Sequence, residues 1–157
     1  MLDINVKVEG QKVVINNLQA FAKEIPLAID RSLNRVAKGI HREGYDFLSG
    51  AGAKASDVAA GEYPVPVRTG HLRRSLDWLK PGTSKTGDVG TFTAGSHEVI
   101  VYNSAIYANA IHEGKFSSQK HGPRRFLADA LEKFNQGDRI KNTIEEEIQK
   151  EIDKRRL

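Results

Sequence analysis

Apolar and polar residues alternate along the start of the chain, which is the period of a half-buried β-strand. The apolar side of the pattern consists of Leu2, Ile4, Val6 and Val8. Gly10 marks a turn, and the segment 12–15, KVVI, is expected to pair back as a second short strand.

From Asn16 onward the apolar period becomes helical. Apolar residues recur every three or four positions from Leu18 to Phe47, while lysines and arginines occupy the opposite face. Pro26 lacks a backbone donor and clashes with the preceding turn, so it should kink the helix or begin a fresh segment. The pattern therefore predicts a long amphipathic helix that ends at about Phe47.

Residues 49–62, SGAGAKASDVAAGE, contain small residues and glycines without apolar periodicity. Such a stretch buries too little surface to offset the entropy of ordering, so a mobile loop is predicted. Its length is typical of loops that are functional or that become ordered against a partner.

Three strands are predicted in the second half of the chain, at about 75–79, 88–94 and 97–103. The segments KPGTSKTG and AGS are expected to be the turns between them. Because the last strand carries a continuous apolar run from Val99 to Tyr102, it should be covered on both faces.

Three helices should follow. A short one fits AIYANAIHEG and is closed by Gly114, and a second opens at Pro123 and runs through Phe134. The segment 138–157 predicts a peripheral C-terminal helix with one narrow apolar row, which consists of Ile140, Ile144, Ile148 and Ile152. One row covers little area, so this helix should lie on the rim, fray at its end or pair with a neighbouring subunit.

Together these elements predict a single α+β domain spanning residues 1–157. We expect a mainly antiparallel sheet of about four strands, packed against the long N-terminal helix and the C-terminal helices. The length suits one core, and neither an internal repeat nor a second domain is evident.

The formal net charge of +4 is concentrated in the middle of the chain, where residues 63–125 carry nine basic and four acidic side chains. Such a surplus suits a polyanion or an acidic protein surface, although it is weak beside dedicated nucleic-acid binders. No apolar run has the length of a membrane span, and the N-terminus lacks a signal-peptide pattern, so a protein made in a cytoplasm is expected.

The residues offer little for catalysis. The five histidines lack the spacing of a metal-binding pair, and the chain has no cysteine, so neither a metal site nor a cofactor is expected. His71, Ser75 and Asp77 are neighbours in sequence, but the Gly-x-Ser-x-Gly turn of nucleophilic serines is missing. AGAKAS lacks the Gly-Lys-Ser/Thr of a phosphate loop, and the acids at 145–147 point in different directions. We therefore expect that the protein is not an enzyme.

The stretch YPVPVRTGHLRRSL, residues 63–76, is the most distinctive in the chain. Pro64 and Pro66 hold the backbone extended, Thr69 is a candidate helix cap, and Gly70 permits a sharp change of direction. The arginines that follow can make forked bonds to carboxylates or phosphates. A turn leading into a strand, with solvated arginines, fits the same residues.

Our functional hypothesis for this corner is a partner interface, with valine and leucine as apolar anchors and arginines as pairing groups. The candidate interface residues are Val65, Val67, Arg68, Thr69, Gly70, Leu72, Arg73 and Arg74.

The same stretch resembles the Pro-Val-x-Thr-Gly-x-Leu-x-x-Ser element of the small bacteriophage neck, head–tail connector and tail-completion proteins. Residues 107–114, YANAIHEG, are similar to that family's Tyr-Ala-x-x-x-x-x-Gly element, and residues 122–133, GPRRFLADALEK, to its Pro-x-Arg-Phe-Leu-x-x-Ala-Leu helix. The three motifs occur in the family's order. Arg68 departs from the pattern by standing where an acid is common, and the loop at 49–62 is longer than usual.

The resemblance implies a structural virion protein of the head–tail junction, made and assembled in the cytoplasm of a bacterial host. It would form a ring, a hexamer or a dodecamer, between head-closure and tail-terminator or tail-tube proteins, with no membrane contact. Ring assembly needs contacts between different patches of neighbouring copies. Residues 49–75 are expected to supply much of that contact, and the loop at 49–62 to become ordered on assembly.

Two alternatives stay open. Arg124 and Arg125 either line a channel and make passing contact with DNA phosphates, or form pairs within the protein. We favour pairing within the protein. Phe126 should pack under the sheet. Its expected neighbours are Leu127, Ala130, Leu131 and Phe134.

The competing function is a small basic nucleic-acid-binding or nuclease-type protein of a mobile element. The shortage of aromatic residues for base stacking is evidence against it.

Overall fold

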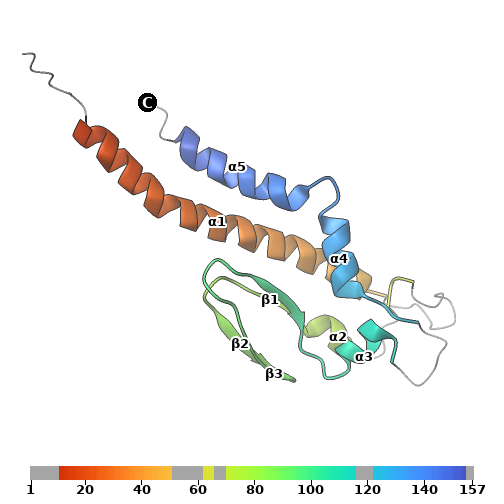
Figure 1. Ribbon diagram of the computed structural model, residues 1–157. Helices are drawn as coiled ribbons and strands as arrows, with labels where there is room; N and C mark the ends of the chain where they lie inside the picture. Colours follow the sequence, from red (N-terminus) through yellow and green to blue (C-terminus); the bar gives the residue numbers. More distant parts are fainter. Residues whose placement is uncertain (1–10, 51–61, 66–69, 116–121, 155–157) are drawn as a thin grey trace, which may run out of the picture.

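A computed structural model describes residues 11–50, 62–65, 70–115 and 122–154 (Figure 1). The expected strand at 2–8 and most of the loop at 49–62 lie outside these residues. The elements in chain order are α1 (Gln11–Phe47), α2 (His71–Arg74), β1 (Leu76–Leu79), β2 (Ser84–Gly87), β3 (Gly90–Thr93), β4 (Ile100–Asn103), α3 (Ala108–Glu113), α4 (Phe126–Phe134) and α5 (Arg139–Asp153). The predicted α+β class is confirmed.

The helix α1 is continuous over 37 residues and ends at Phe47 as predicted. The expected strand at 12–15 is wrong, because these residues belong to the first turns of α1. No fresh segment begins at Pro26, which lies inside the helix. The carbonyl that proline deprives of its donor belongs to Ala22, an exposed residue, so water can satisfy it.

The four strands form two antiparallel sheets of two strands each, where the sequence predicted one sheet of about four. β1 pairs with β4, with Leu76 opposite Asn103, and β2 pairs with β3, with Ser84 opposite Thr93. β2 lies in a segment expected to be a turn. A turn around Gly82, at φ 69°, reverses the chain after β1 and begins this second sheet.

The β2–β3 hairpin folds back against the β1–β4 ladder. Phe92 of β3 stacks on Tyr102 of β4 with 4.1 Å between ring centroids, and Lys85 of β2 pairs with Asp77 of β1. On its other face β4 packs Val101 against buried residues of α1 and α4. The prediction that this strand is covered on both faces is therefore confirmed.

The helix α4 lies close against α1. Val36 and Ile40 of α1 form a buried cluster with Ala130 and Phe134 of α4. Leu131, which was expected in this core, is 45% exposed, because it lies on the outer flank of α4. The helix begins at Phe126, three residues after the proline that was expected to open it.

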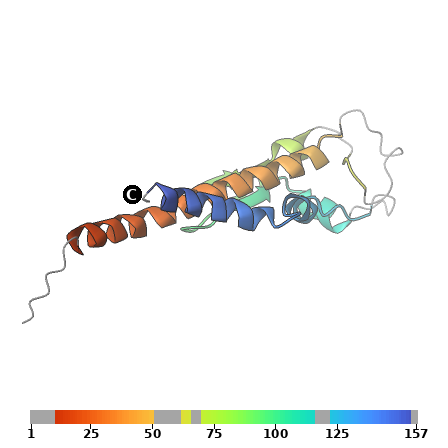
Figure 2. The same cartoon turned by 90° about the horizontal axis from the view of Figure 1, so that it is seen from above.

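The helix α5 runs back along α1, and the first turns of α1 project beyond its end (Figures 1 and 2). The four isoleucines of the predicted row are all half-buried, and Ile140 packs on the core. The buried residues of α5 are instead the polar Thr143 and Glu151.

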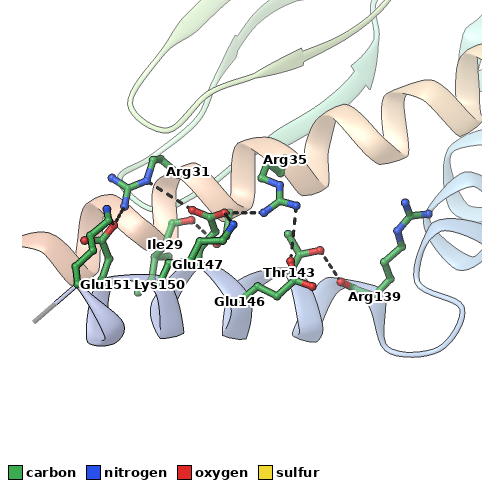
Figure 3. Close-up of polar contacts among 11 residues, drawn as sticks. Ile29, Arg31, Arg35, Arg139, Thr143, Glu146, Glu147, Lys150 and Glu151 are labelled. Atoms are coloured by element: carbon green, nitrogen blue, oxygen red, sulfur yellow. Dashed lines mark hydrogen bonds and ion pairs between the residues drawn. The ribbon is translucent and has the colours of Figure 1, made fainter. Parts of the chain in front are cut away.

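Ion pairs attach α5 to α1 (Figure 3). Arg31 donates to Glu151 at 2.5 Å, and Arg35 donates to Glu147 at 2.6 Å. Lys150 also donates to Glu147, at 2.8 Å. Two arginines one turn apart on α1 thus face two glutamates one turn apart on α5, which fixes the register of the two helices.

Gly39→Ala should destabilise the protein, although alanine favours helix by ~1 kcal/mol at an ordinary position. A Cβ at residue 39 would lie 2.0 Å from Cε2 of Phe134, so the buried ring or the helices must shift. We expect a net loss of about 2 kcal/mol in the free energy of unfolding, measured by urea denaturation. Combining it with Phe134→Leu should recover part of the loss; strict additivity of the two changes would contradict this packing.

Glu147→Gln should weaken the attachment of α5 by about 1 kcal/mol, because the glutamate side chain is mostly buried but its partners are half exposed. Hydrogen bonds from Lys150 and then Arg35 hold the pKa of Glu147 below its usual value, although burial opposes them. The stabilisation is therefore present above about pH 4.3 and is lost as pH falls through the lowered pKa.

Urea denaturation from neutral pH to pH 3 would test this expectation, with Glu145→Gln as the control on the exposed face of the same helix. The Glu147 variant should show a shallower loss of stability in acid than the wild type. Parallel acid profiles for the two variants would contradict it.

Candidate functional site

The three motif-bearing segments meet in one core at the C-terminal end of α1. The stretch 63–76 contributes the largest share, 107–114 contributes α3, and 122–133 contributes α4. The buried residues of this cluster are Leu48, Val65, Leu72, Leu76, Ala105, Ala108 and Phe126. The expected burial of Phe126 is confirmed, and the motifs are neighbours in space as well as ordered in sequence.

Val65 and Leu72 are packed within this chain, whereas we expected them to anchor a neighbouring subunit. Val65 donates its backbone N–H to the carbonyl of Phe47 at 2.8 Å, which draws the extended segment onto the end of α1. The carbonyl of Leu72 accepts from Asn103 Nδ2 at 2.7 Å. These two hydrogen bonds hold the segment against the end of α1 and against β4. The side chains of Val65 and Leu72 therefore lie in the core of the chain itself.

Gly70 has φ 70° and is the N-cap of α2, so the predicted sharp turn is confirmed. Val67, Arg68 and Thr69 lie outside the described residues. Of the remaining candidates, Arg74 is exposed and Arg73 is half-buried.

Arg124 is a structural side chain. It is 4% exposed, and its Nε donates to the carbonyl of Glu62 at 2.8 Å, tying α4 to the segment 62–65. Burial lowers the pKa of Arg124 from its usual value, an effect opposed by Tyr63. This position supports pairing within the protein over the channel-lining alternative, whereas Arg125 is exposed at the N-cap of α4.

Tyr63 strengthens the same junction. Its ring stacks on Phe47 with 4.2 Å between centroids, and its hydroxyl donates to Asp129 of α4. Burial, followed by the hydrogen bond to Asp129, raises the pKa of Tyr63 well above its usual value. The phenol therefore remains a donor at any physiological pH.

His71 and Ser75 come together with Asp88 rather than with Asp77, their neighbour in the sequence. His71 Nε2 lies 2.8 Å from Asp88 Oδ2 and 3.5 Å from Ser75 Oγ, while Asp77 pairs with Lys85. A catalytic triad uses one ring nitrogen for the acid and the other for the nucleophile. Here both groups face the same nitrogen and the serine is distant, so this set fastens the β2–β3 hairpin to α2.

A basic surface extends from α1 onto α2. Lys38, Arg42 and Tyr45 lie at one-turn spacings near the end of α1, and the guanidinium carbon of Arg73 lies 5.2 Å from the ring centroid of Tyr45. Arg74 follows on α2. We call these five residues the basic face.

Aromatic contacts support the basic face from beneath. His41 meets Trp78 of β1 edge-on at 4.8 Å, and its Nε2 lies 3.2 Å from the carbonyl of Leu76. A carbonyl only accepts, so this nitrogen carries the proton. Trp78 Nε1 donates to Asn34 at 3.2 Å, which completes the connection between β1 and α1.

Sequence reasoning assigned Lys38 and Arg42 to the general solvent-facing side of the helix and did not connect them with Arg73 and Arg74. Their one-turn spacing with Tyr45 was a signal within α1. The contact between Tyr45 and Arg73 of α2 forms only when the chain folds, so the sequence alone carries no signal for it.

The described residues contain no group of three or more histidine, aspartate and glutamate side chains able to hold a metal ion. Within the same ranges, no helix combines the length and apolar character needed to cross a membrane. Comparison with known proteins gives no match: none to a protein-family model, none to a curated protein and none to a solved structure.

Arg124→Met should lower the free energy of unfolding by about 2 kcal/mol, because it removes the buried, charged donor whose hydrogen bond ties α4 to the segment 62–65. The matched control is Arg125→Met, at the next and exposed position, which should change stability by less than about 0.5 kcal/mol. Urea denaturation measures both variants. Equal losses would contradict the structural role assigned to Arg124.

Proposed function

We propose that this protein is a structural virion component of the bacteriophage head–tail junction, where copies form a ring that joins the DNA-filled head to the tail. The observation that carries the proposal is the meeting of the three family-like segments in one core. In that core, the segment 63–76 provides the turn at Gly70, 107–114 provides the helix end at Gly114, and 122–133 provides packing residues of α4. Three ordered motifs with such structural roles are what proteins of a shared architecture would have in common.

The projecting part of α1 offers a contact surface for ring assembly. Ile15 and Leu18 are exposed there, Leu18 to 62%. Leu18 precedes the buried Val36 by 18 residues, which are five helical turns, so it lies on the core-facing side of α1. The first turns of α1 project past the end of α5 (Figure 2). In a ring this helix would lie on a different patch of the next copy, which is a heterologous contact.

This location differs from the contact first expected at 49–75, since Val65 and Leu72 serve the chain's own core. The remaining partners follow from the family: a hexamer or dodecamer stacked between head-closure and tail-terminator or tail-tube proteins. The protein would be assembled in the host cytoplasm and retained in the virion, and Arg125 remains available for a passing contact with DNA.

Disruption of the gene in the parent phage should yield DNA-filled heads lying apart from complete tails in electron micrographs of the lysate. Wild-type protein supplied in trans should restore joined particles. Normal, infectious particles without the protein would overturn the proposal. They would favour the alternative of a small nucleic-acid-binding or nuclease-type protein, which has no part in joining heads to tails.

Leu18→Lys should impair joining without unfolding the chain, because the side chain is exposed in the single subunit. We expect about tenfold fewer joined particles in the complementation assay, as an interface loss of ~1.4 kcal/mol produces. Asn17→Lys adds the same charge at an adjacent exposed position and should complement normally. Circular dichroism checks the folding of both variants, and equal complementation by the two would exclude this contact.

A further inference from the structure

Cations along one side of α1 have different surroundings, depending on whether they lie beside α5. Arg31 and Arg35 are each paired with glutamates of α5. Within the described ranges, no ion pair is formed by Lys38, Arg42, Arg73 or Arg74, the four cations of the basic face. The first group therefore attaches α5 to α1. The positive charge of the second group is accessible to a ligand.

The acids around the basic face do not neutralise it. Asp77 on β1 is paired with Lys85, and Asp88 is held by His71. Asp46 follows Arg42 by four residues and is exposed, but no ion pair joins the two side chains. The four cations thus outnumber the one nearby carboxylate that lacks a cation in the described structure.

The geometry of the basic face suits a row of phosphates. Lys38 and Arg42 stand one helical turn apart, ~6 Å along the axis of α1. Arg73 lies over the ring of Tyr45, and its buried Nε has no hydrogen-bond partner in the described residues. Stacking on a ring restrains a guanidinium before binding, so its terminal nitrogens can meet a phosphate at lower entropic cost.

We infer that the basic face of α1 and α2 binds the phosphate backbone of duplex DNA. The centre of an interface with a protein partner usually has few charged residues and an apolar anchor. This surface instead consists of lysine and arginine side chains around the ring of Tyr45. A single strand would need open aromatic platforms for its bases, and Arg73 already covers Tyr45. Duplex phosphates require only the cations, because the release of counterions supplies the affinity.

One chain carries the complete basic face, so the inference does not rest on ring assembly and is tested on the isolated full-length protein. Fluorescence anisotropy with a short labelled duplex of mixed sequence, at several KCl concentrations, gives the affinity and its salt dependence. The test variant K38Q/R42Q/R74Q retains Arg73 because that side chain packs on Tyr45. The control K23Q/K115Q/K141Q removes the same charge from exposed lysines elsewhere.

The test variant should bind at least about tenfold more weakly at low salt, with the slope of log K against log salt reduced by about 0.9 per lost phosphate contact. The control should bind much as the wild type does. Equal weakening of the two variants would overturn the inference, since net charge alone would then explain binding.

Two competitors test the chemical class of the ligand. Polyglutamate that displaces the duplex at equal charge concentration would overturn the inference in favour of an acidic protein surface. Tighter binding of single-stranded DNA would overturn the assignment of a duplex. If the triple variant fails to fold, Arg42→Gln and Arg74→Gln, each exposed, provide the same comparison singly. Particle morphology reports separately on the head–tail function.

Discussion

The close approach of α1 and α4 at Gly39 is the contact on which the arrangement of the other elements depends. With no side chain at this position, the ring of Phe134 lies directly against the backbone of α1. That approach brings Phe126, at the other end of α4, into the core that holds the segment 63–76 and α3. It also sets where the chain turns back into α5, so one small residue governs both ends of the molecule.

Local patterns predicted the parts of the fold that local physics determines. The end of α1 at Phe47, the turn at Gly70 and the helix end at Gly114, where φ is 71°, follow from apolar periodicity or from the conformational freedom of glycine. The strand β2 could not be predicted in this way. Its SKTG sequence is polar and short, and it becomes a strand only because the hairpin pairs it with β3.

The candidate site was less predictable because it depends on distant neighbours. Arg31 and Arg35 look like Lys38 and Arg42 in the sequence. Only the position of α5 separates the cations that pair with its glutamates from those that form no ion pair among the described residues. Val65 and Leu72 looked like surface anchors because their segment is rich in proline and arginine. The fold instead places α1, α2 and α4 around them.

The two C-terminal helices are attached by opposite kinds of force. The helix α4 is held by buried apolar side chains, whose association is insensitive to moderate salt, whereas α5 also depends on ion pairs between half-exposed arginines and largely buried glutamates. Ionic strength therefore acts on them separately: mobile ions screen the attraction between α5 and α1 and leave the α1–α4 contact intact. The ionic environment thus sets how firmly the last fifteen-residue helix stays closed on the chain.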